Sequence, residues 1–287
     1  MRELTPETIT DAVLDQMATT PDPRLKTIMA SAVKHLHAFA REVNLTPAEW
    51  IKGIEFMTAA GKMCSPERQE FILLSDTLGV SMVVDLISHR VKGCATESTV
   101  FGPFHREGAP ALPFGGNIAA GESGMPTIVE GRVLDTGGRP IAGATLDVWQ
   151  TDSSGLYDSQ TATPNTLHMR GIFQTNSEGR YRIRTVRPVH YQIPSDGPVG
   201  RMLRATGRHP WRPAHIHFVV SAEAYQPVTT HIFDSIDPYL TSDAVFAVKE
   251  SLICRFVEHA TDDAEARRLG VPAPFCTASF DFVLQSC

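Results

Sequence analysis

Two histidines separated by one residue, His215 and His217, carry the sharpest chemical signal in the sequence. The following Val219 and Val220 favour a β-strand, in which alternate side chains point to the same face. Both imidazoles would then lie side by side and could chelate one metal ion, since histidine is the commonest metal ligand. Such a pair is also compatible with two packed or surface histidines that bind nothing, so the remaining donors matter.

Two kinds of residue could complete a metal site. Glu223 and Asp234 follow the pair and would give a two-histidine, one-carboxylate iron site, although neither stands in an obvious ligand context. Tyr157 and Tyr191 precede the pair, and each alone reads as a packed or rim residue, because a phenol ionises only at about pH 10. A trivalent cation can nevertheless hold a phenolate at neutral pH. Position along the chain does not choose between these two sets.

The elements that must position these residues change character along the chain. Residues 5–90 show apolar residues at three- and four-residue spacing and two helix-start signals, Thr46-Pro47-Ala48-Glu49 and Ser65-Pro66, which predict three or four helices. Residues 102–126 are rich in Gly, Pro and Ala and predict an irregular connector. Alternating segments then predict short strands at residues 127–134, 144–149, 171–175, 180–186, 215–221 and 280–284, with a long irregular loop at 191–213.

Short strands joined by regular turns favour a mainly β fold, an antiparallel β-sandwich that follows a helical N-terminal region. We therefore expect a helical domain over residues 1–105 and a sandwich domain over residues 106–287.

Composition excludes several classes of protein. The 287 residues are 42% hydrophobic and 20% charged, which suits a packed core, and the net charge of −6 leaves no basic surplus for nucleic acid. We expect no membrane span, because no apolar run reaches about 18 residues, and no signal peptide at the N-terminus. Five widely spaced cysteines without a C-x-x-C pair argue against a disulfide framework or a cysteine zinc site and favour the cytoplasm.

Four separated segments together resemble the intradiol ring-cleavage dioxygenases, namely residues 147–152 (DVWQTD), 155–158 (GLYD), 191–200 (YQIPSDGPVG) and 207–218 (GRHPWRPAHIHF). They follow the family's order and spacing, and the resemblance covers nearly the whole chain. It implies one non-haem Fe(III) per subunit, held by Tyr157, Tyr191, His215 and His217. It further implies a homodimer formed through the N-terminal helices, with a phospholipid at the interface as an additional expectation.

The resemblance also implies roles for individual residues. An aromatic diol would bind iron through two adjacent oxygens and then react with O2. Tyr191 would leave the metal and take one substrate proton, while Tyr157 would stay bound. Arg212 would stabilise carbanion character on the ring, although a surface salt bridge is the alternative for this residue. His231 departs from the catechol-cleaving pattern, which usually carries Gln there, and we place it near the site without a role.

Several segments look more like the hydroxyquinol (benzene-1,2,4-triol) branch of the family, namely residues 68–76, 98–104, 209–212, 230–233 and 242–246. That likeness implies a substrate pocket lined by Leu73, Asp76, Val100, Phe101, Gly102, Pro103, Phe104, Ile193, Pro194, Arg212 and Val245. Asp76 is informative, because a carboxylate in an apolar helical run needs a partner. A third substrate hydroxyl would serve, as would an N-cap or an ion pair. The expected product is 3-hydroxy-cis,cis-muconate, the enol form of maleylacetate.

Two alternatives stay open at this point. The substrate could be catechol or a chlorocatechol, cleaved on the same fold. The chain could instead be a non-catalytic, prealbumin-like binding module, which residues 129–146 would suit on their own. That second alternative offers no reason for the histidine pair together with the two tyrosines. A red colour, caused by charge transfer from phenolate to iron, would distinguish the enzyme from the module.

Overall fold

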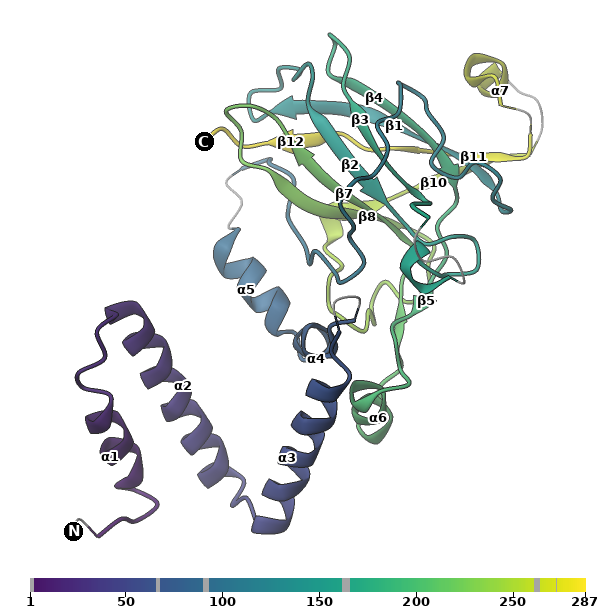
Figure 1. The fold of residues 1–287 in the computed structure, drawn as a ribbon. Helices are drawn as coiled ribbons and strands as arrows, with labels where there is room; N and C mark the ends of the chain where they lie inside the picture. Colours follow the sequence, from purple (N-terminus) through teal and green to yellow (C-terminus); the bar gives the residue numbers. More distant parts are fainter. Residues whose placement is uncertain (1–2, 66–67, 90–92, 162–165, 261–263, 272) are drawn as a thin grey trace. The chain divides into compact units, whose positions relative to one another are not determined.

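The computed structural model describes residues 3–65, 68–89, 93–161, 166–260, 264–271 and 273–287. The chain divides into two compact units, Met1–Ala59 and Ala60–Cys287, and each is described by itself. Figure 1 shows that the first unit is helical, whereas the second combines β-sheets with shorter helices.

The first unit contains α1 (Ile9–Gln16), α2 (Pro23–Glu42) and most of α3 (Pro47–Lys62). The Asp22 carboxylate caps α2 by accepting the backbone N–H of Arg24 at 2.8 Å. The predicted start of α3 is confirmed. Thr46 N–H donates to Glu49 Oε2 at 2.9 Å, and Glu49 N–H donates to Thr46 Oγ1 at 3.3 Å, which is a capping box.

The second unit begins with two short helices, α4 (Glu70–Thr77) and α5 (Val80–Ser88). Helix α4 starts at Glu70 rather than at the Ser65-Pro66 signal, of which Pro66 lies outside the described residues. The apolar stretch of residues 71–87 forms two helices, because the chain turns at Gly79, whose φ of +74° lies in the left-handed region that glycine adopts without a steric penalty.

Two five-stranded sheets and one short ribbon follow. The first sheet contains β1 (Pro126–Asp135), β4 (Arg180–Val186), β10 (Phe256–His259), β11 (Phe275–Ser279) and β12 (Phe282–Leu284). The second, in the order β3-β2-β7-β8-β9, contains β2 (Thr145–Trp149), β3 (Arg170–Gln174), β7 (His215–Ser221), β8 (Val228–Asp234) and β9 (Ile253–Cys254). The ribbon pairs β5 (Tyr191–Gln192) with β6 (Trp211–Arg212). The strands predicted at residues 180–186 and 215–221 are confirmed with the same bounds.

The prediction of an antiparallel sandwich is correct only in part, because both sheets are mixed. β1 runs parallel to β11 and β12, and β8 runs parallel to β9, whereas the other pairings are antiparallel. Local turn signals predict hairpins, and hairpins join antiparallel strands. The parallel partners of β1 come from the far C-terminal end of the chain, where no local signal indicates their direction.

The two sheets enclose the main apolar core, in which Val129 of β1 packs with Ile216 and Phe218 of β7. Side chains alternate along a strand. His215 and His217 therefore point to the opposite face of the second sheet. The residue types of β7 thus send the apolar side chains into the sandwich and both imidazoles away from it.

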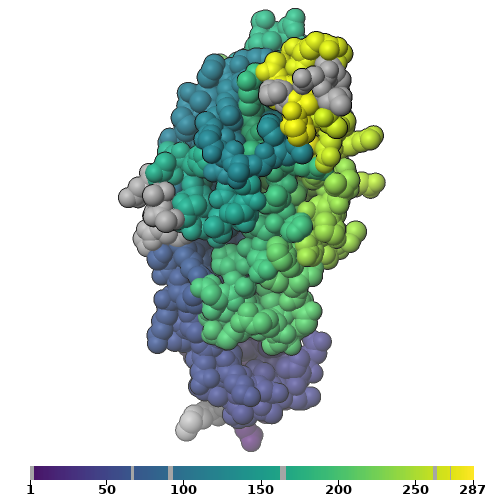
Figure 2. Space-filling view, turned by 90° about the vertical axis from the view of Figure 1, so that its right-hand side faces the viewer, coloured from purple at the N-terminus to yellow at the C-terminus, as the bar shows by residue number. Residues whose placement is uncertain are grey.

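Helices cover the face of the second sheet that carries the imidazoles. Leu73 of α4, Met82 of α5 and Leu203 of α6 (Pro198–Ala205) pack with Trp149 and Phe233 of the sheet. Helix α6 lies inside the segment predicted to be an irregular loop. Figure 2 shows the blue segment of α4 beside the green segment of α6. The remaining short helices are η1 (Asp158–Gln160), η2 (Glu250–Leu252) and α7 (Ala264–Leu269).

Among the described residues, no single helix is long and apolar enough to cross a bilayer. Helices α4 and α5 together meet that length and composition, but they are bent by 75° at the break between them.

Candidate metal centre

Four side chains converge at the helix-covered face of the second sheet. Tyr157 Oη lies 2.9 Å from His217 Nε2 and 3.3 Å from Tyr191 Oη. The Nε2 atoms of His215 and His217 are 3.1 Å apart. The four residues are only 1% to 5% exposed. The structure therefore brings together the four residues that the family resemblance implies as metal ligands.

Three separate segments supply these side chains. β7 carries both imidazoles on one face. Tyr191 lies in β5, directly opposite Arg212 of β6, so this ribbon holds the phenol and the guanidinium at one register position. Tyr157 immediately precedes η1, and its backbone N–H donates to Gln160 Oε1 at 3.0 Å.

Hydrogen bonding and burial prepare the imidazoles to act as ligands. His215 Nδ1 lies 2.7 Å from the carbonyl oxygen of Pro213, so Nδ1–H donates there and the lone pair of Nε2 faces the other donors. Burial, and then the charge of Arg212, lowers the pKa of His215. Burial and the neighbouring imidazole of His231 lower the pKa of His217. Both rings are neutral at neutral pH, which is the metal-binding form.

The phenol of Tyr157 is held in an apolar setting. Burial raises the pKa of Tyr157 well above its ordinary value, Tyr191 adds to that rise, and Arg212 opposes it. The ring of Phe104 stacks on Tyr157, with centroids 4.4 Å apart and an angle of 16° between the planes. Ionisation of this phenol therefore needs a strong positive charge close by, such as a trivalent cation among the donors.

Arg212 lies beside the donors and not at the surface, so the salt-bridge alternative at the surface is wrong. Its Nη1 donates to Tyr191 Oη at 3.2 Å and lies 3.3 Å from His215 Nε2, and the residue is 3% exposed. Burial alone would lower the pKa of Arg212, but Asp243 and the tyrosine oxygens outweigh burial and raise it above its ordinary value. The guanidinium thus stays charged.

Asp243 anchors this guanidinium. Arg212 Nε donates to Asp243 Oδ1 at 3.2 Å, and the backbone N–H of Ala247 donates to Asp243 Oδ2 at 3.0 Å. Asp243 was not among the predicted site residues, although it lies in the segment 242–246 that resembles the hydroxyquinol branch. Its charged side chain amid apolar neighbours was the available signal.

Two further supports were also missed. Trp149 of β2 stacks on His217, with ring centroids 4.6 Å apart. Asp158, next to Tyr157, accepts Arg170 Nε at 2.8 Å, and both side chains are 1% exposed. Trp149 and Asp158 lie within the motifs that carry the resemblance, but their contacts come from strands distant in sequence.

The donor set fits a hard, highly charged cation better than the carboxylate alternative does. Phenolate oxygens are hard anionic donors, and imidazole nitrogen suits iron. Asp234 is engaged elsewhere, because its carboxylate accepts Arg187 Nε at 2.8 Å. Glu223 is exposed after the end of β7. Neither carboxylate joins the imidazoles.

The residues expected to line the substrate pocket fall into three groups, and the lining of the two hollows among them includes none of the four donors. One hollow of about 680 Å³ is lined by Asp76, Val100, Phe101 and Gly102. A second, of about 370 Å³, is lined by Leu73, Pro103, Phe104 and Pro194. The last group, Ile193 and Val245, is buried in the apolar cluster that includes Tyr157 and Tyr191.

Gly102 brings the backbone of the predicted pocket segment 100–104 close to His217. Its φ is +75°, and a Cβ at this position would lie 3.5 Å from His217 Cε1. The left-handed backbone conformation, which other residues rarely adopt, is the physical reason for glycine here.

Asp76 is 4% exposed near the C-terminal end of α4, so the N-cap alternative is wrong. It forms no ion pair within the described part of the chain. Burial raises the pKa of Asp76, while the Ser81 hydroxyl and the charge of Arg212 oppose that rise. The carboxyl group thus lines the hollow without a strong partner from the protein.

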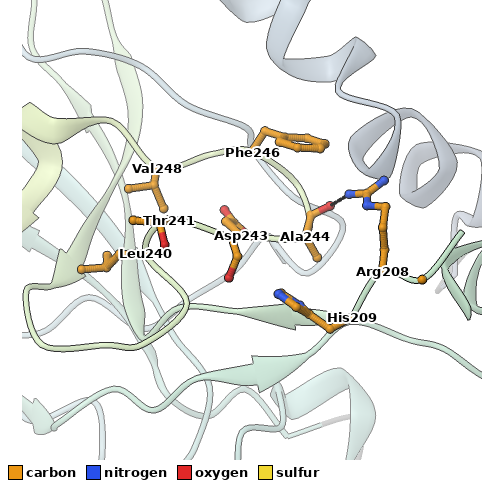
Figure 3. Close-up of a pocket in the computed structure, with 10 residues that line it drawn as sticks. Arg208, His209, Leu240, Thr241, Asp243, Ala244, Phe246 and Val248 are labelled. Carbon is orange, nitrogen blue, oxygen red and sulfur yellow. Dashed lines mark hydrogen bonds between the residues drawn. The ribbon is translucent and has the colours of Figure 1, made fainter.

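A further hollow of about 480 Å³ lies away from the four donors. Figure 3 shows it between Arg208, His209 and the segment from Leu240 to Val248. Arg208 Nη2 donates to the Ala244 carbonyl at 3.0 Å, and its guanidinium lies 5.0 Å from the centre of the Phe246 ring. Asp243 lines this hollow and also binds Arg212, so one carboxylate joins the hollow to the guanidinium beside the four donors.

The fold and the site together define a β-sandwich protein with a buried tyrosine–histidine centre. Residues 112–286 match the family model described as Dioxygenase, and residues 22–96 match the model described as Catechol dioxygenase N terminus. The chain therefore belongs to the intradiol ring-cleavage dioxygenase family. This membership agrees with the resemblance and sets aside the non-catalytic binding module.

Individual relatives agree with this assignment. The chain is 49% identical over 276 residues to a hydroxyquinol 1,2-dioxygenase of Rhizobium sp., covering 96% of this chain and 93% of the relative. It is 52% identical over 254 residues to a 6-chlorohydroxyquinol 1,2-dioxygenase of Cupriavidus pinatubonensis, covering 88% and 92%. The crystal structure of hydroxyquinol 1,2-dioxygenase from Pseudomonas putida DLL-E4 matches with a TM-score of 0.92 and 49% identity, covering 98% and 99%. Catechol 1,2-dioxygenase of Acinetobacter radioresistens matches with a TM-score of 0.87 but 28% identity, covering 100% and 95%.

Proposed function

We propose that this chain cleaves hydroxyquinol with O2 to 3-hydroxy-cis,cis-muconate, with one Fe(III) per subunit held by Tyr157, Tyr191, His215 and His217. The observation that carries the proposal is the convergence of two phenols and two imidazoles in one buried cluster, with oxygen and nitrogen atoms 2.9 to 3.3 Å apart. Identities of 49% and 52% to enzymes named for hydroxyquinol substrates support the choice of substrate.

Ferric iron held by these donors would accept electron density from a chelated diol and so activate its ring. The protein's part is to manage protons and charge. Tyr191 Oη accepts a substrate proton as its phenolate becomes a neutral phenol. Arg212 Nη1, 3.2 Å from that oxygen, keeps its own proton and places a fixed positive charge beside the ring. Tyr157 stays ionised under the Phe104 ring.

Asp76 provides the preference for a triol. Its buried carboxyl group lines the same hollow as Val100, Phe101 and Gly102. A third hydroxyl on the substrate would hydrogen-bond to this carboxyl group, which has the Ser81 hydroxyl but no ion pair from the described residues. Catechol has no such hydroxyl and would not form this additional hydrogen bond.

Oxygen uptake with benzene-1,2,4-triol and with catechol at equal concentration tests the proposal. We expect a red iron-loaded protein that consumes O2 faster with the triol. Tyr157→Phe should weaken and shift the charge-transfer band, because Tyr191 then remains as the single phenolate ligand. The matched variant Tyr239→Phe, at a tyrosine that stacks on Trp211 outside the centre, should keep it. A colourless iron-loaded protein would contradict the ligand set, and faster uptake with catechol would contradict the substrate.

We also propose that the helices of residues 1–105 form a homodimer and bind a phospholipid at its interface, while residues 106–287 carry the catalytic centre. Exposed apolar side chains on α2 and α3, including Leu36, Phe39 and Trp50, support this proposal. Light scattering should give twice the chain mass, and mass spectrometry of a lipid extract should detect the phospholipid. A monomer at micromolar concentration would contradict the dimer.

A further inference from the structure

A third imidazole lies against the two that the centre uses. His231 of β8 is directly opposite His217 of β7. Its ring centroid is 4.0 Å from that of His217 and 4.7 Å from that of His215. One nitrogen on each of the three rings lies within 4.8 Å of one on each of the others, and His231 is completely buried.

The hydrogen bonding of this cluster is incomplete. In the described part of the chain, neither ring nitrogen of His231 forms a hydrogen bond of good geometry, although the backbone of Val100 lies close to the ring, and His217 Nδ1 also lacks a partner. Buried polar atoms without partners are rare in folded proteins, and an ion or a water commonly accounts for them. His231 therefore presents at least one free nitrogen in a buried position beside the two histidine ligands proposed above.

The chemistry of three imidazoles differs from that of the mixed phenol and imidazole set. Divalent zinc and cobalt bind well to neutral imidazoles, and three histidines are a known protein donor set for zinc. A divalent charge is also less able than a trivalent one to ionise the buried phenol of Tyr157. One buried cluster of side chains thus offers two overlapping donor sets, suited to cations of different charge.

We propose that His215, His217 and His231 form a binding site for a divalent transition-metal cation such as Zn²⁺ or Co²⁺. This site shares two imidazoles with the ferric centre proposed above and excludes iron when it is occupied. One nitrogen of His231 already lies within 4.8 Å of a nitrogen on each of the other two rings. Activity would then depend on which metal the protein binds, because a divalent cation in this site keeps iron out.

Cobalt binding to the full-length protein after removal of iron by a chelator tests the proposal. Co²⁺ absorbs visible light when bound by nitrogen ligands, so titration gives its affinity directly. We expect His231→Gln to weaken Co²⁺ binding about tenfold or more, since even supporting partners of metal ligands change affinity by that factor. Tyr157→Phe should leave Co²⁺ affinity unchanged while weakening and shifting the red ferric band. His231→Gln should keep that band.

Two controls separate this result from a general disturbance. His105→Gln alters a histidine whose ring lies 4.7 Å from Trp149 but outside the cluster, and it should bind Co²⁺ as the wild type does. X-ray absorption of the wild-type cobalt protein should count three imidazoles, a measurement that needs no variant to fold. Equal Co²⁺ affinity of His231→Gln and wild type, or a count of two imidazoles, would overturn the proposal. If iron-loaded wild-type protein showed no phenolate-to-iron band, the result would instead refute the proposed iron centre.

Discussion

Replacement of Asp76 by alanine tests how the centre selects its substrate. The side chain is 4% exposed, and the carboxyl group faces a hollow of about 680 Å³ without an ion-pair partner in the described residues. A hydrogen bond that involves a charged or strongly polar group contributes about 1.5 to 3 kcal/mol. Its loss corresponds to about a 10- to 100-fold decrease in kcat/KM for the triol, since 1.4 kcal/mol is tenfold. Catechol, which lacks the third hydroxyl, should change by less than about threefold.

The assay compares kcat/KM for benzene-1,2,4-triol and catechol in the wild type and in Asp76→Ala. Ile72→Val is the matched control, because Ile72 is an apolar residue that lies one turn before Asp76 on α4 and lines the same hollow. We expect this control to lower both values equally or not at all. The ratio of the two specificity constants is the decisive number, because it cancels changes in iron content and in the fraction of folded protein.

An equal loss on both substrates would refute the selective role of Asp76. It would indicate that the carboxyl group supports the pocket as a whole, through its neighbours on α4 and α5. A larger loss on catechol than on the triol would contradict the geometry more strongly, because it would place the third hydroxyl away from this group.

Three further outcomes follow from the buried charges. Asp243→Asn should lower the free energy of unfolding by about 3 kcal/mol, because it removes the counter-charge of a buried arginine; a change below about 1 kcal/mol in urea unfolding would contradict this. Glu70→Gln should lower the free energy of unfolding by about 1.5 kcal/mol, because Glu70 is completely buried and binds Arg68. Asp196→Asn alters the exposed second partner of Arg68 and should lower it by under about 1 kcal/mol. Equal losses in the two variants would contradict the argument from burial. Burial raises the pKa of Asp76 in the folded state, so the unfolded chain releases that proton at a lower pH and the free energy of unfolding falls as pH rises above about 4. Unfolding curves measured across this pH range should show the decline in the wild type and not in Asp76→Asn. A decline of the same size in Asp76→Asn would contradict this prediction.

Local patterns account for the elements that were predicted well. Apolar residues alternate with the two histidines along β7, so the sequence predicts both the strand and the shared face of His215 and His217. The capping box at Thr46 and Glu49 likewise involves residues three apart, and it begins α3 where predicted. Helix α6 was missed because the flanking glycines and prolines of residues 191–213 outweighed its short amphipathic stretch.

Long-range contacts account for what the sequence left open. The residues alone did not choose between tyrosine and carboxylate ligands, and only the resemblance to a family made that choice. A phenol becomes a candidate ligand through burial and neighbours, and Tyr157 meets Tyr191 across 34 positions of the chain. Asp243 binds Arg212, which lies 31 residues earlier in the chain, and no local sequence pattern predicts that pairing.

The sequence by itself therefore determined the strand that carries the imidazoles, the helical start of the chain and the change to β-structure. The tertiary structure alone decided the parallel partners of β1, the anchoring of Arg212 and the position of His231 beside His217. The physical reason is the range of the forces involved. Side-chain alternation and capping act between neighbours in the chain, whereas burial and electrostatics depend on which distant segments the fold brings into contact.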